Sequence, residues 1–329
     1  MMKNQTRMAM TINRVISERI RSSESFLIVS HVRPDADAAG SVLGIGLALK
    51  KAGKSVQMVL ADGIGKYSFL PGSELITTVP VQPVDMIIIL DCSDPTRVGE
   101  VLNGFGKPDL VVDHHKTNLQ FADINVVEPE QVATAAILHD HLPNWGLSID
   151  SDVATCLLAG IVGDTIGFST PNVDAEVMRR AANLMDFGAD LTDIYREEIT
   201  NKSFDSVRYW GAGLTRLSHE DGIVWTSLTL ADRKNIGYAG NDDADLVNVL
   251  SSIKGAKIAM IFVEQNKNFV KISLRARPGI DVSSVALEFG GGGHAAAAGA
   301  EIEGSLDIVQ SQVLEKTRKL LDKIDMEKE

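Results

Sequence analysis

Short apolar runs recur along the first 130 residues, and amphipathic stretches lie between and after them. The apolar runs cover residues 25–30, 55–61, 84–90, 109–112 and 124–127. Several contain no polar alternation, which is typical of strands buried on both faces of a parallel sheet. Helical periodicity covers residues 38–54, 132–142, 151–164 and 174–188. A short amphipathic helix precedes them, with Ile12, Val15, Ile16 and Ile20 on one face. Strands alternating with helices predict a doubly wound α/β domain.

The pattern changes near residue 190. Residues 191–217 form a long, charged and aromatic helical stretch, which we interpret as a connector. Beyond it, half-buried alternation predicts strands at residues 222–230, 256–265 and 268–277, and helices are expected at 242–253, 281–288 and 305–324. We therefore expect a first domain over residues 1–190, a helical linker over 191–215 and a smaller α/β domain over 216–329.

Acidic and imidazole side chains follow several of the predicted strands. The residues concerned are His31, Asp35, Asp37, Asp91, Asp113, His114 and His115, and Asp164 follows a predicted helix. Taken singly, an aspartate after a strand is most often a helix cap or a turn residue, and Asp37 is itself a good cap candidate. Ligands of parallel α/β sheets, however, bind where the carboxyl ends of the strands converge. Together these carboxylates would repel one another strongly unless a cation lay among them.

The ligand types narrow the choice of cation. Carboxylate oxygens and imidazoles without thiolates suit Mn²⁺, with Mg²⁺ and Co²⁺ as alternatives, better than a structural zinc site. The number of candidate ligands exceeds what one ion needs, so two ions that share a carboxylate fit better. Such a pair can activate a bridging hydroxide and polarise a phosphoryl oxygen. The pattern therefore indicates hydrolysis of a phosphoester or a phosphoanhydride.

Composition limits the substrates and the compartment. The net charge of −12 argues against a broad basic groove for long nucleic acid. No apolar stretch is long enough to span a membrane, and the N-terminal segment lacks the apolar core of a signal peptide, so we expect a cytoplasmic protein. Cys92 and Cys156 lie in apolar segments and read as reduced core thiols. An anionic substrate would need a local source of positive charge.

The second domain contains a candidate for that source. Gly290, Gly291, Gly292 and Gly293 precede His294 and an alanine run, which we expect to form a helix with an anion-binding nest at its start. Without the residues that follow it, the glycine run would indicate a flexible turn, and this alternative stays open. The basic strand "KISLRAR" carries Lys271, Arg275 and Arg277, and alternation places both arginines on one face. Arg275 is the candidate for a bidentate phosphate contact, although a solvated strand edge is also consistent with this pattern.

Five stretches together resemble a known family. "HVRPDADAAGS", "ILDCSDPTRVG", "VVDHHKTN" and "GIVGDTIGF" resemble the four sequential motifs of the DHH phosphoesterase superfamily, and "FGGGGHAAAAG" resembles the glycine-rich signature of its DHHA1 domain. The order and the length most resemble the nanoRNase A branch. The resemblance implies an N-terminal DHH domain with a mainly parallel sheet flanked by helices, a smaller α/β DHHA1 domain, and an active-site cleft between them.

The resemblance also implies an activity and a role for each matched residue. Members of the branch are Mn²⁺-dependent oligoribonucleases and 3′-phosphoadenosine 5′-phosphate (PAP) phosphatases, some relatives act on cyclic or linear dinucleotides, and many are homodimers. One Mn²⁺ would be held by His31, Asp35 and Asp91, and the other by Asp37, Asp91, His114 and Asp164. Asp113 would orient an imidazole, and His115 would face the scissile phosphate. Arg275, Gly291, Gly292, Gly293 and His294 would bind substrate.

Two alternatives stay open at this point. One is an inorganic pyrophosphatase or exopolyphosphatase of the same superfamily, against which the glycine-rich ending counts. The other is a non-catalytic nucleotide-binding module, against which the full set of matched ligand positions counts. One departure bears on the substrate: Phe168 is followed by Ser169, where the family often has arginine.

Overall fold

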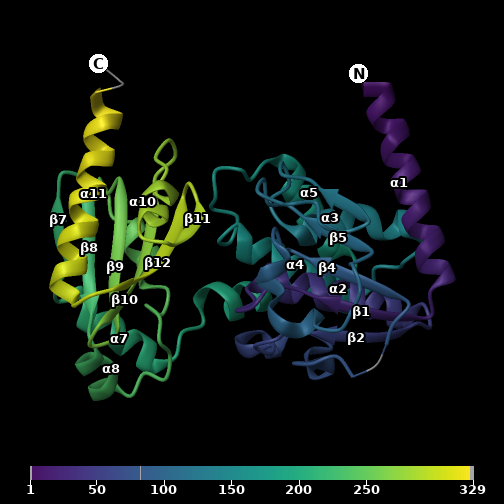
Figure 1. Ribbon diagram of the computed structural model, residues 1–329, viewed down its shortest axis with the longest axis horizontal. Helices are drawn as coiled ribbons and strands as arrows, with labels where there is room; N and C mark the ends of the chain where they lie inside the picture. Colours follow the sequence, from purple (N-terminus) through teal and green to yellow (C-terminus); the bar gives the residue numbers. More distant parts are fainter. Residues whose placement is uncertain (1, 82, 327–329) are drawn as a thin grey trace. The chain divides into compact units, whose positions relative to one another are not determined.

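The computed structural model describes residues 2–81 and 83–326 and divides into two compact units, Met1–Asn201 and Lys202–Glu329 (Figure 1). The division falls inside the predicted linker. That linker is not one continuous helix: α6 (Leu191–Tyr195) runs into a π-helical turn (Arg196–Thr200), and α7 (Phe204–Leu214) starts anew after the N-cap Ser203. Among the described residues, no helix is long and apolar enough to cross a membrane.

The first unit is built on a six-stranded sheet in the order β3-β2-β1-β4-β5-β6, and every paired neighbour is parallel. The strands are β1 (Ser25–Val29), β2 (Ser55–Val59), β3 (Ile76–Thr77), β4 (Met86–Leu90), β5 (Leu110–Asp113) and β6 (Ile124–Val127). The predicted parallel sheet is confirmed, and the two-residue β3 is the strand that the apolar pattern did not predict.

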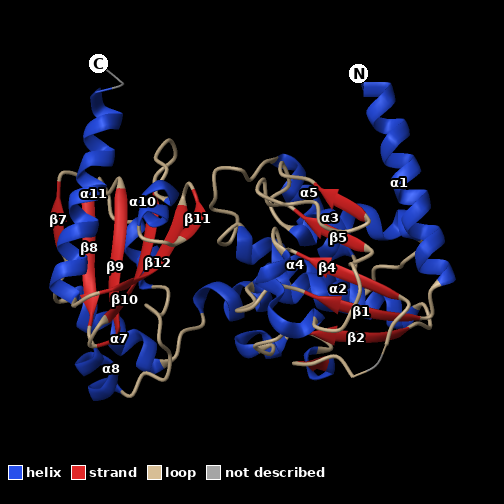
Figure 2. Ribbon diagram, viewed as in Figure 1, coloured by secondary structure: helices blue, strands red, loops and turns tan. Residues whose placement is uncertain are grey.

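Both faces of this sheet are covered. Its helices are α1 (Met2–Ser22), α2 (Ala36–Lys51), α3 (Thr134–His141), α4 (Ser151–Asp164) and α5 (Ala175–Asp186) (Figure 2). Short 3-10 segments lie in the connections at Gly65–Phe69, Ser73–Leu75, Pro95–Leu102 and Leu142–Trp145. One core joins alternate strand residues such as Leu90 and Val112 to α2, α3 and α4. The intervening strand residues, such as Val29 and Ile89, face Val98 and Val101 of a 3-10 turn. Burial on both faces explains why the strands read as uninterrupted apolar runs.

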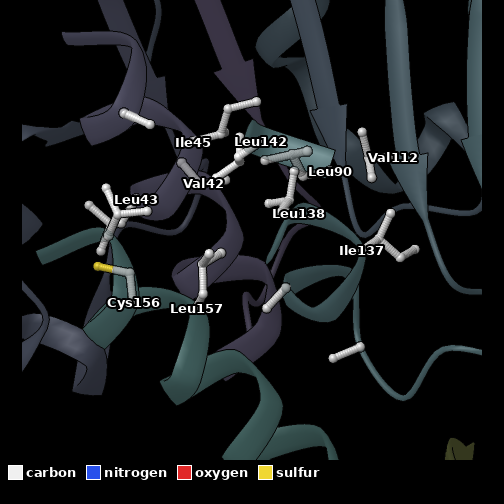
Figure 3. Close-up of a cluster of buried hydrophobic side chains, with 14 of the residues drawn as sticks. Val42, Leu43, Ile45, Leu90, Val112, Ile137, Leu138, Leu142, Cys156 and Leu157 are labelled. Atoms are coloured by element: carbon white, nitrogen blue, oxygen red, sulfur yellow. The ribbon is translucent and has the colours of Figure 1, made fainter. Parts of the chain in front are cut away.

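The helices α2 and α4 pack closely enough to need a glycine between them. A Cβ atom on Gly40 of α2 would lie 2.3 Å from the Cys156 carbonyl oxygen of α4. Figure 3 shows Leu43 of α2 beside Cys156, with Leu157 of α4 in the same core. This close contact fixes the start of α2, and with it the residues that follow β1.

The second unit contains a mixed sheet in the order β11-β12-β10-β9-β8-β7, in which only β8 and β9 pair in parallel. Its strands are β7 (Ser218–Glu220), β8 (Ile223–Leu228), β9 (Ile258–Asn266), β10 (Phe269–Ala276), β11 (Gly292–His294) and β12 (Ala297–Glu303). Its helices are α7, α8 (Leu230–Ile236), α9 (Leu246–Ser251), α10 (Ser283–Glu288) and α11 (Leu306–Met326). The predicted α/β character of this unit is confirmed.

The alanine run after His294 forms a turn, at Ala295 and Ala296, and the start of β12, so the predicted helix there is wrong. Residues of β12 pair with β10 from Ala297 opposite Arg275 to Glu303 opposite Phe269. Ala298 and Ala300 are buried in the core of the unit, and a Cβ on Gly299 would lie 2.7 Å from the Ile272 carbonyl oxygen. The small residues are therefore needed for sheet packing, which overrides the helical propensity of alanine.

Candidate metal centre

The order of the strands places the candidate ligands at a topological switch point. The chain proceeds from β1 to β2 on one side of the sheet and from β4 to β5 on the other, so β1 and β4 are neighbours. His31 follows β1, Asp91 follows β4 directly, and His114 follows β5 directly. Ligands of parallel sheets bind in the crevice that opens at such a point.

His31, Asp35 and Asp91 form a first group of candidate ligands, whose ligand atoms all lie within 4.8 Å of one another. The Nε2 atom of His31 is 3.5 Å from Asp91 Oδ2 and 3.7 Å from Asp35 Oδ2. The Nδ1 atom of His31 donates to the Val32 carbonyl at 2.9 Å, which directs Nε2 toward the carboxylates. Asp35 is also the N-cap of α2, because its side chain accepts from the Ala38 backbone amide. The cap candidate predicted from the sequence, Asp37, lies instead in the first turn of the helix.

Asp37, His114 and Asp164 form a second group, again with ligand atoms within 4.8 Å. The Nε2 atom of His114 is 3.2 Å from Asp164 Oδ2 and 3.6 Å from Asp91 Oδ1. Its Nδ1 atom faces the Gln131 carbonyl at 3.3 Å. Asp91 therefore contacts a histidine of each group, one through each carboxylate oxygen. All six predicted ligands are brought together by the fold.

The carboxylate of Asp37 is held by the first turn of α3. Asp37 is fully buried and accepts from the amides of Thr134 at 2.6 Å and Ala135 at 2.8 Å. The Thr134 hydroxyl donates to Asp91 Oδ1 at 3.1 Å, so one residue supports two candidate ligands. A Cβ on Gly160 would lie 2.8 Å from Asp37 Oδ1. Thr134 is not among the predicted site residues, and its position near the start of a predicted helix is the signal that could have identified it.

The clustered charges shift the protonation of the site. Burial disfavours the charged imidazole of His31, but Asp35 and Asp91 outweigh it and raise its pKa to about 10. Burial likewise opposes protonation of His114, whose pKa is raised to about 10 by Asp164, Asp91 and Asp37. Burial, together with neighbouring carboxylates, raises the pKa of Asp164 to about 6, although His114 opposes this. Protons on His31, His114 and Asp164 thus compensate the negative charge of the clustered carboxylates when no other cation is bound.

These residues fit divalent cations. Within residues 2–81 and 83–326, the ion-pair partners of Asp35, Asp91 and Asp164 are all histidines, and no lysine or arginine neutralises them. Each group offers one imidazole Nε2 whose other nitrogen faces a backbone carbonyl, the arrangement that orients metal-bound histidines. Oxygen-rich sites with imidazole suit Mn²⁺ and its hard competitors.

Asp113 and His115 form a hydrogen-bonded pair beside these groups. The His115 Nδ1 atom donates to Asp113 Oδ1 at 2.7 Å, and the His115 amide donates to the same oxygen at 3.2 Å. Burial opposes ionisation of Asp113, but its hydrogen bonds from His115 and Asn118 outweigh it and lower its pKa. His115 Nδ1 also lies 3.6 Å from Asp91 Oδ1, so the pair adjoins the carboxylate that contacts a histidine of each group.

The predicted substrate-binding residues all lie in the second unit. Arg275 donates through Nε to Asn248 Oδ1 at 3.0 Å and through Nη1 to the Leu274 carbonyl at 3.1 Å. Burial lowers its pKa, while Asp243 and Asp245 oppose this. Arg277 lies beyond the end of β10, and its Nε donates to the Ala256 carbonyl at 3.2 Å.

The glycine run leads into β11 and contributes Gly292 and Gly293 to it, so the helix predicted to begin after the run is wrong. A Cβ on Gly291 would lie 2.2 Å from the Gly299 carbonyl oxygen, and one on Gly293 would lie 2.5 Å from that of Ala297. These two glycines thus permit β11 to lie against β12. A Cβ on Gly292 would have no atom of a residue beyond its chain neighbours within 4 Å, and both Gly292 and His294 are exposed.

Comparison with known proteins identifies similar chains. Residues 25–161 match the model of the DHH family, N-terminal domain, and residues 234–327 match that of the DHHA1 domain. The chain is 34% identical over 315 residues to the bifunctional oligoribonuclease and PAP phosphatase NrnA of Thermus thermophilus, covering 94% of each chain. Identity to NrnA of Bacillus subtilis is 23%, over 85% of this chain and 90% of that protein.

Two further similarities concern other named activities. The chain is 23% identical to the cyclic-di-AMP phosphodiesterase PdeA of Listeria monocytogenes, covering 98% of this chain and 51% of that protein. The crystal structure of an exopolyphosphatase-related protein from Bacteroides fragilis superposes with a TM-score of 0.87 at 27% identity, covering 95% of this chain and 98% of that one.

Proposed function

The chain belongs to the DHH family and is a metal-dependent phosphoesterase, and from that premise we propose that it hydrolyses very short oligoribonucleotides and linear dinucleotides, and PAP, with two Mn²⁺ ions. The observation that carries the proposal is the pair of ligand groups on either side of Asp91. The identity to NrnA of Thermus thermophilus over nearly the whole of both chains supports the substrate class.

In this proposal one ion is held by His31, Asp35 and Asp91, and the other by Asp37, Asp91, His114 and Asp164. When bound, the ions activate the attacking water and neutralise charge on the phosphoryl oxygens. The hydrogen bonds of Thr134 to Asp37 and Asp91 hold both carboxylates in place before any ion arrives.

We assign proton transfer and charge stabilisation to His115. The hydrogen bond to Asp113 fixes a proton at Nδ1 of His115, so exchange with the leaving oxygen takes place at Nε2. The lowered pKa of Asp113 keeps its carboxylate charged, so that it continues to accept from His115 Nδ1 and holds this tautomer during the transfer.

We assign phosphate recognition to Arg275, Gly291, Gly292, Gly293 and His294 of the second unit. Arg275 is the cation among them, and its guanidinium is held by Asn248. The net charge of −12 favours a local contact of this kind over a long basic groove, so substrates of a few nucleotides are expected. The similarity to PdeA adds cyclic-di-AMP as a further candidate substrate. The buried free thiols of Cys92 and Cys156 support a cytoplasmic location.

A substrate panel tests the proposal. The purified chain is assayed on pApA, on RNAs of increasing length, on PAP, on cyclic-di-AMP and on pyrophosphate and polyphosphate, with Mn²⁺, Mg²⁺ and Co²⁺ compared. An Asp91→Asn variant purified in the same way controls for contaminating nucleases. We expect turnover of pApA and PAP with Mn²⁺, falling as RNA lengthens.

The same panel separates the alternatives. Turnover confined to polyphosphate or pyrophosphate would favour the activity in the name of the Bacteroides fragilis neighbour. Release no greater than that of the Asp91→Asn control on every substrate would refute a hydrolytic function for this centre.

A further inference from the structure

Asn118 lies in the loop after β5 and joins the two segments that carry Asp91 and the Asp113–His115 pair. Its Nδ2 atom donates to Asp113 Oδ2 at 2.6 Å and to the Cys92 carbonyl at 3.2 Å. The oxygen of the Asn118 side-chain amide is also fixed, because Oδ1 accepts from the backbone amide of Gln120 at 2.6 Å. An oxygen at the Nδ2 position would face two acceptors, so the hydrogen bonds permit only one orientation of this amide.

The contact with Asp113 determines how that carboxylate meets the histidine. Asp113 is fully buried, and its two oxygens have separate partners: Oδ2 accepts from Asn118, while Oδ1 accepts twice from His115. A carboxylate held at one oxygen can neither rotate nor approach the histidine through the other. The imidazole is then held at one position and in one tautomer.

The contact with Cys92 ties the same loop to the strand end that carries Asp91. Cys92 follows Asp91 directly, and the residue after Asn118 continues the connection, since the Leu119 amide donates to the Ser93 carbonyl at 2.9 Å. The backbone amide of Asn118 also donates to the His115 carbonyl at 3.2 Å, which forms a tight turn between these two residues. Asn118 thus fixes the loop of His115 relative to Asp91, which contacts a histidine of each ligand group.

We propose that Asn118 is a positioning residue for the hydrolytic reaction, which acts by holding Asp113 and, through it, the His115 imidazole. This inference rests on the proposed function, because it assigns Asn118 to the proton-transfer step and not to metal binding. Asn118 touches neither the candidate ligand atoms of His31, Asp35 and Asp37 nor those of Asp164 in any hydrogen bond of the described residues.

A double-mutant cycle tests the assignment. Asn118→Ala is expected to lower kcat for pApA by about 10- to 100-fold, with KM and Mn²⁺ affinity within about twofold of wild type. In a His115→Ala background the same substitution is expected to cause no further loss, because the group that it positions is gone. Asn118→Asp places an acceptor against Asp113 and is expected to lower kcat at least as much, and it gives a second variant should the alanine variant fold poorly.

Asn125→Ala is the matched control. Asn125 also bridges a loop through its amide, with Oδ1 accepting from the Ala122 amide and Nδ2 donating to the Ala122 carbonyl, but it contacts neither Asp113 nor His115. This variant is expected to keep its kcat within about twofold of wild type. A loss of kcat from Asn118→Ala that is equally large in the His115→Ala background would overturn the proposal, as would an unchanged kcat.

A readout that does not need turnover separates this inference from the proposed function. The proton shared by His115 Nδ1 and Asp113 is followed by proton NMR in the metal-free protein, with His115→Ala to assign it. We expect the resonance to shift or to be lost on Asn118→Ala and to persist on Asn125→Ala. If no substrate is hydrolysed, the proposed function fails, whereas an unperturbed resonance in Asn118→Ala refutes the positioning role.

Discussion

Replacing Thr134 with valine removes one hydroxyl from the candidate metal centre and leaves the other hydrogen bonds that support its carboxylates in place. The Thr134 side chain is fully buried and its hydroxyl donates to Asp91 Oδ1 at 3.1 Å. Valine keeps the branched shape, and the backbone amide of residue 134 still donates to Asp37. The change therefore isolates a single hydrogen bond to Asp91, the carboxylate that contacts a histidine of each ligand group.

Two estimates of the effect agree. A hydrogen bond to a charged group contributes about 1.5–3 kcal/mol, and loss of one partner leaves a buried acceptor with less support. Loss of a residue that orients a ligand costs roughly 10- to 100-fold in metal affinity, which corresponds to about 1.4–2.7 kcal/mol. We therefore expect the Mn²⁺ dissociation constant of Thr134→Val to rise by about 10-fold or more.

Isothermal titration calorimetry of chelator-treated protein with Mn²⁺ measures this constant, and thermal unfolding measures stability alongside it. Thr226→Val is the control, because Thr226 is equally buried and its hydroxyl donates to the Gly213 carbonyl in the other compact unit. We expect both variants to lose stability and only Thr134→Val to lose Mn²⁺ affinity. Equal affinities for Thr134→Val and wild type, with the same loss of stability as the control, would refute the reasoning.

Three other changes have defined outcomes. Asp91→Asn should lower kcat/KM by roughly 1,000-fold or more, because metal-based charge stabilisation is worth several kcal/mol; steady-state rates on pApA check this, and near-normal turnover would reject the shared ligand. Gly160→Ala places a Cβ 2.7 Å from Ala135 Cβ and 2.8 Å from Asp37 Oδ1, so urea titration should show a loss of about 1–3 kcal/mol, and an unchanged midpoint would contradict the packing. Burial disfavours the charged Asp140 carboxylate, but His139 and Arg180 outweigh it and lower its pKa to about 2 from 3.8. Asp140→Asn should therefore cost about 1–2 kcal/mol at neutral pH, discounted for partial exposure, and urea titrations should show that cost shrinking as the pH falls from 4 toward 2; a constant cost would disprove the linkage.

The sequence by itself determined the first sheet and grouped most of the candidate metal ligands. Continuous apolar runs specify strands that are buried on both faces, and this local signal located β1 and β4 to within two residues. His31 and Asp91 follow those runs, so the rule that ligands gather at carboxyl ends was enough to group them. Both inferences depend only on residues that are close together along the chain.

The tertiary structure decided which distant segments meet. The Thr134 amide reaches Asp37 across 97 positions and Asn118 reaches the Cys92 carbonyl across 26, and no local periodicity encodes such pairings. The alanine run after His294 has the propensity of a helix, yet Ala295 and Ala296 form a turn, and the buried Ala298 and the close contact at Gly299 belong to β12 where it lies against β10. Propensity acts within a segment, whereas hydrogen-bond partners and close packing are set by the neighbours that the completed fold brings alongside it.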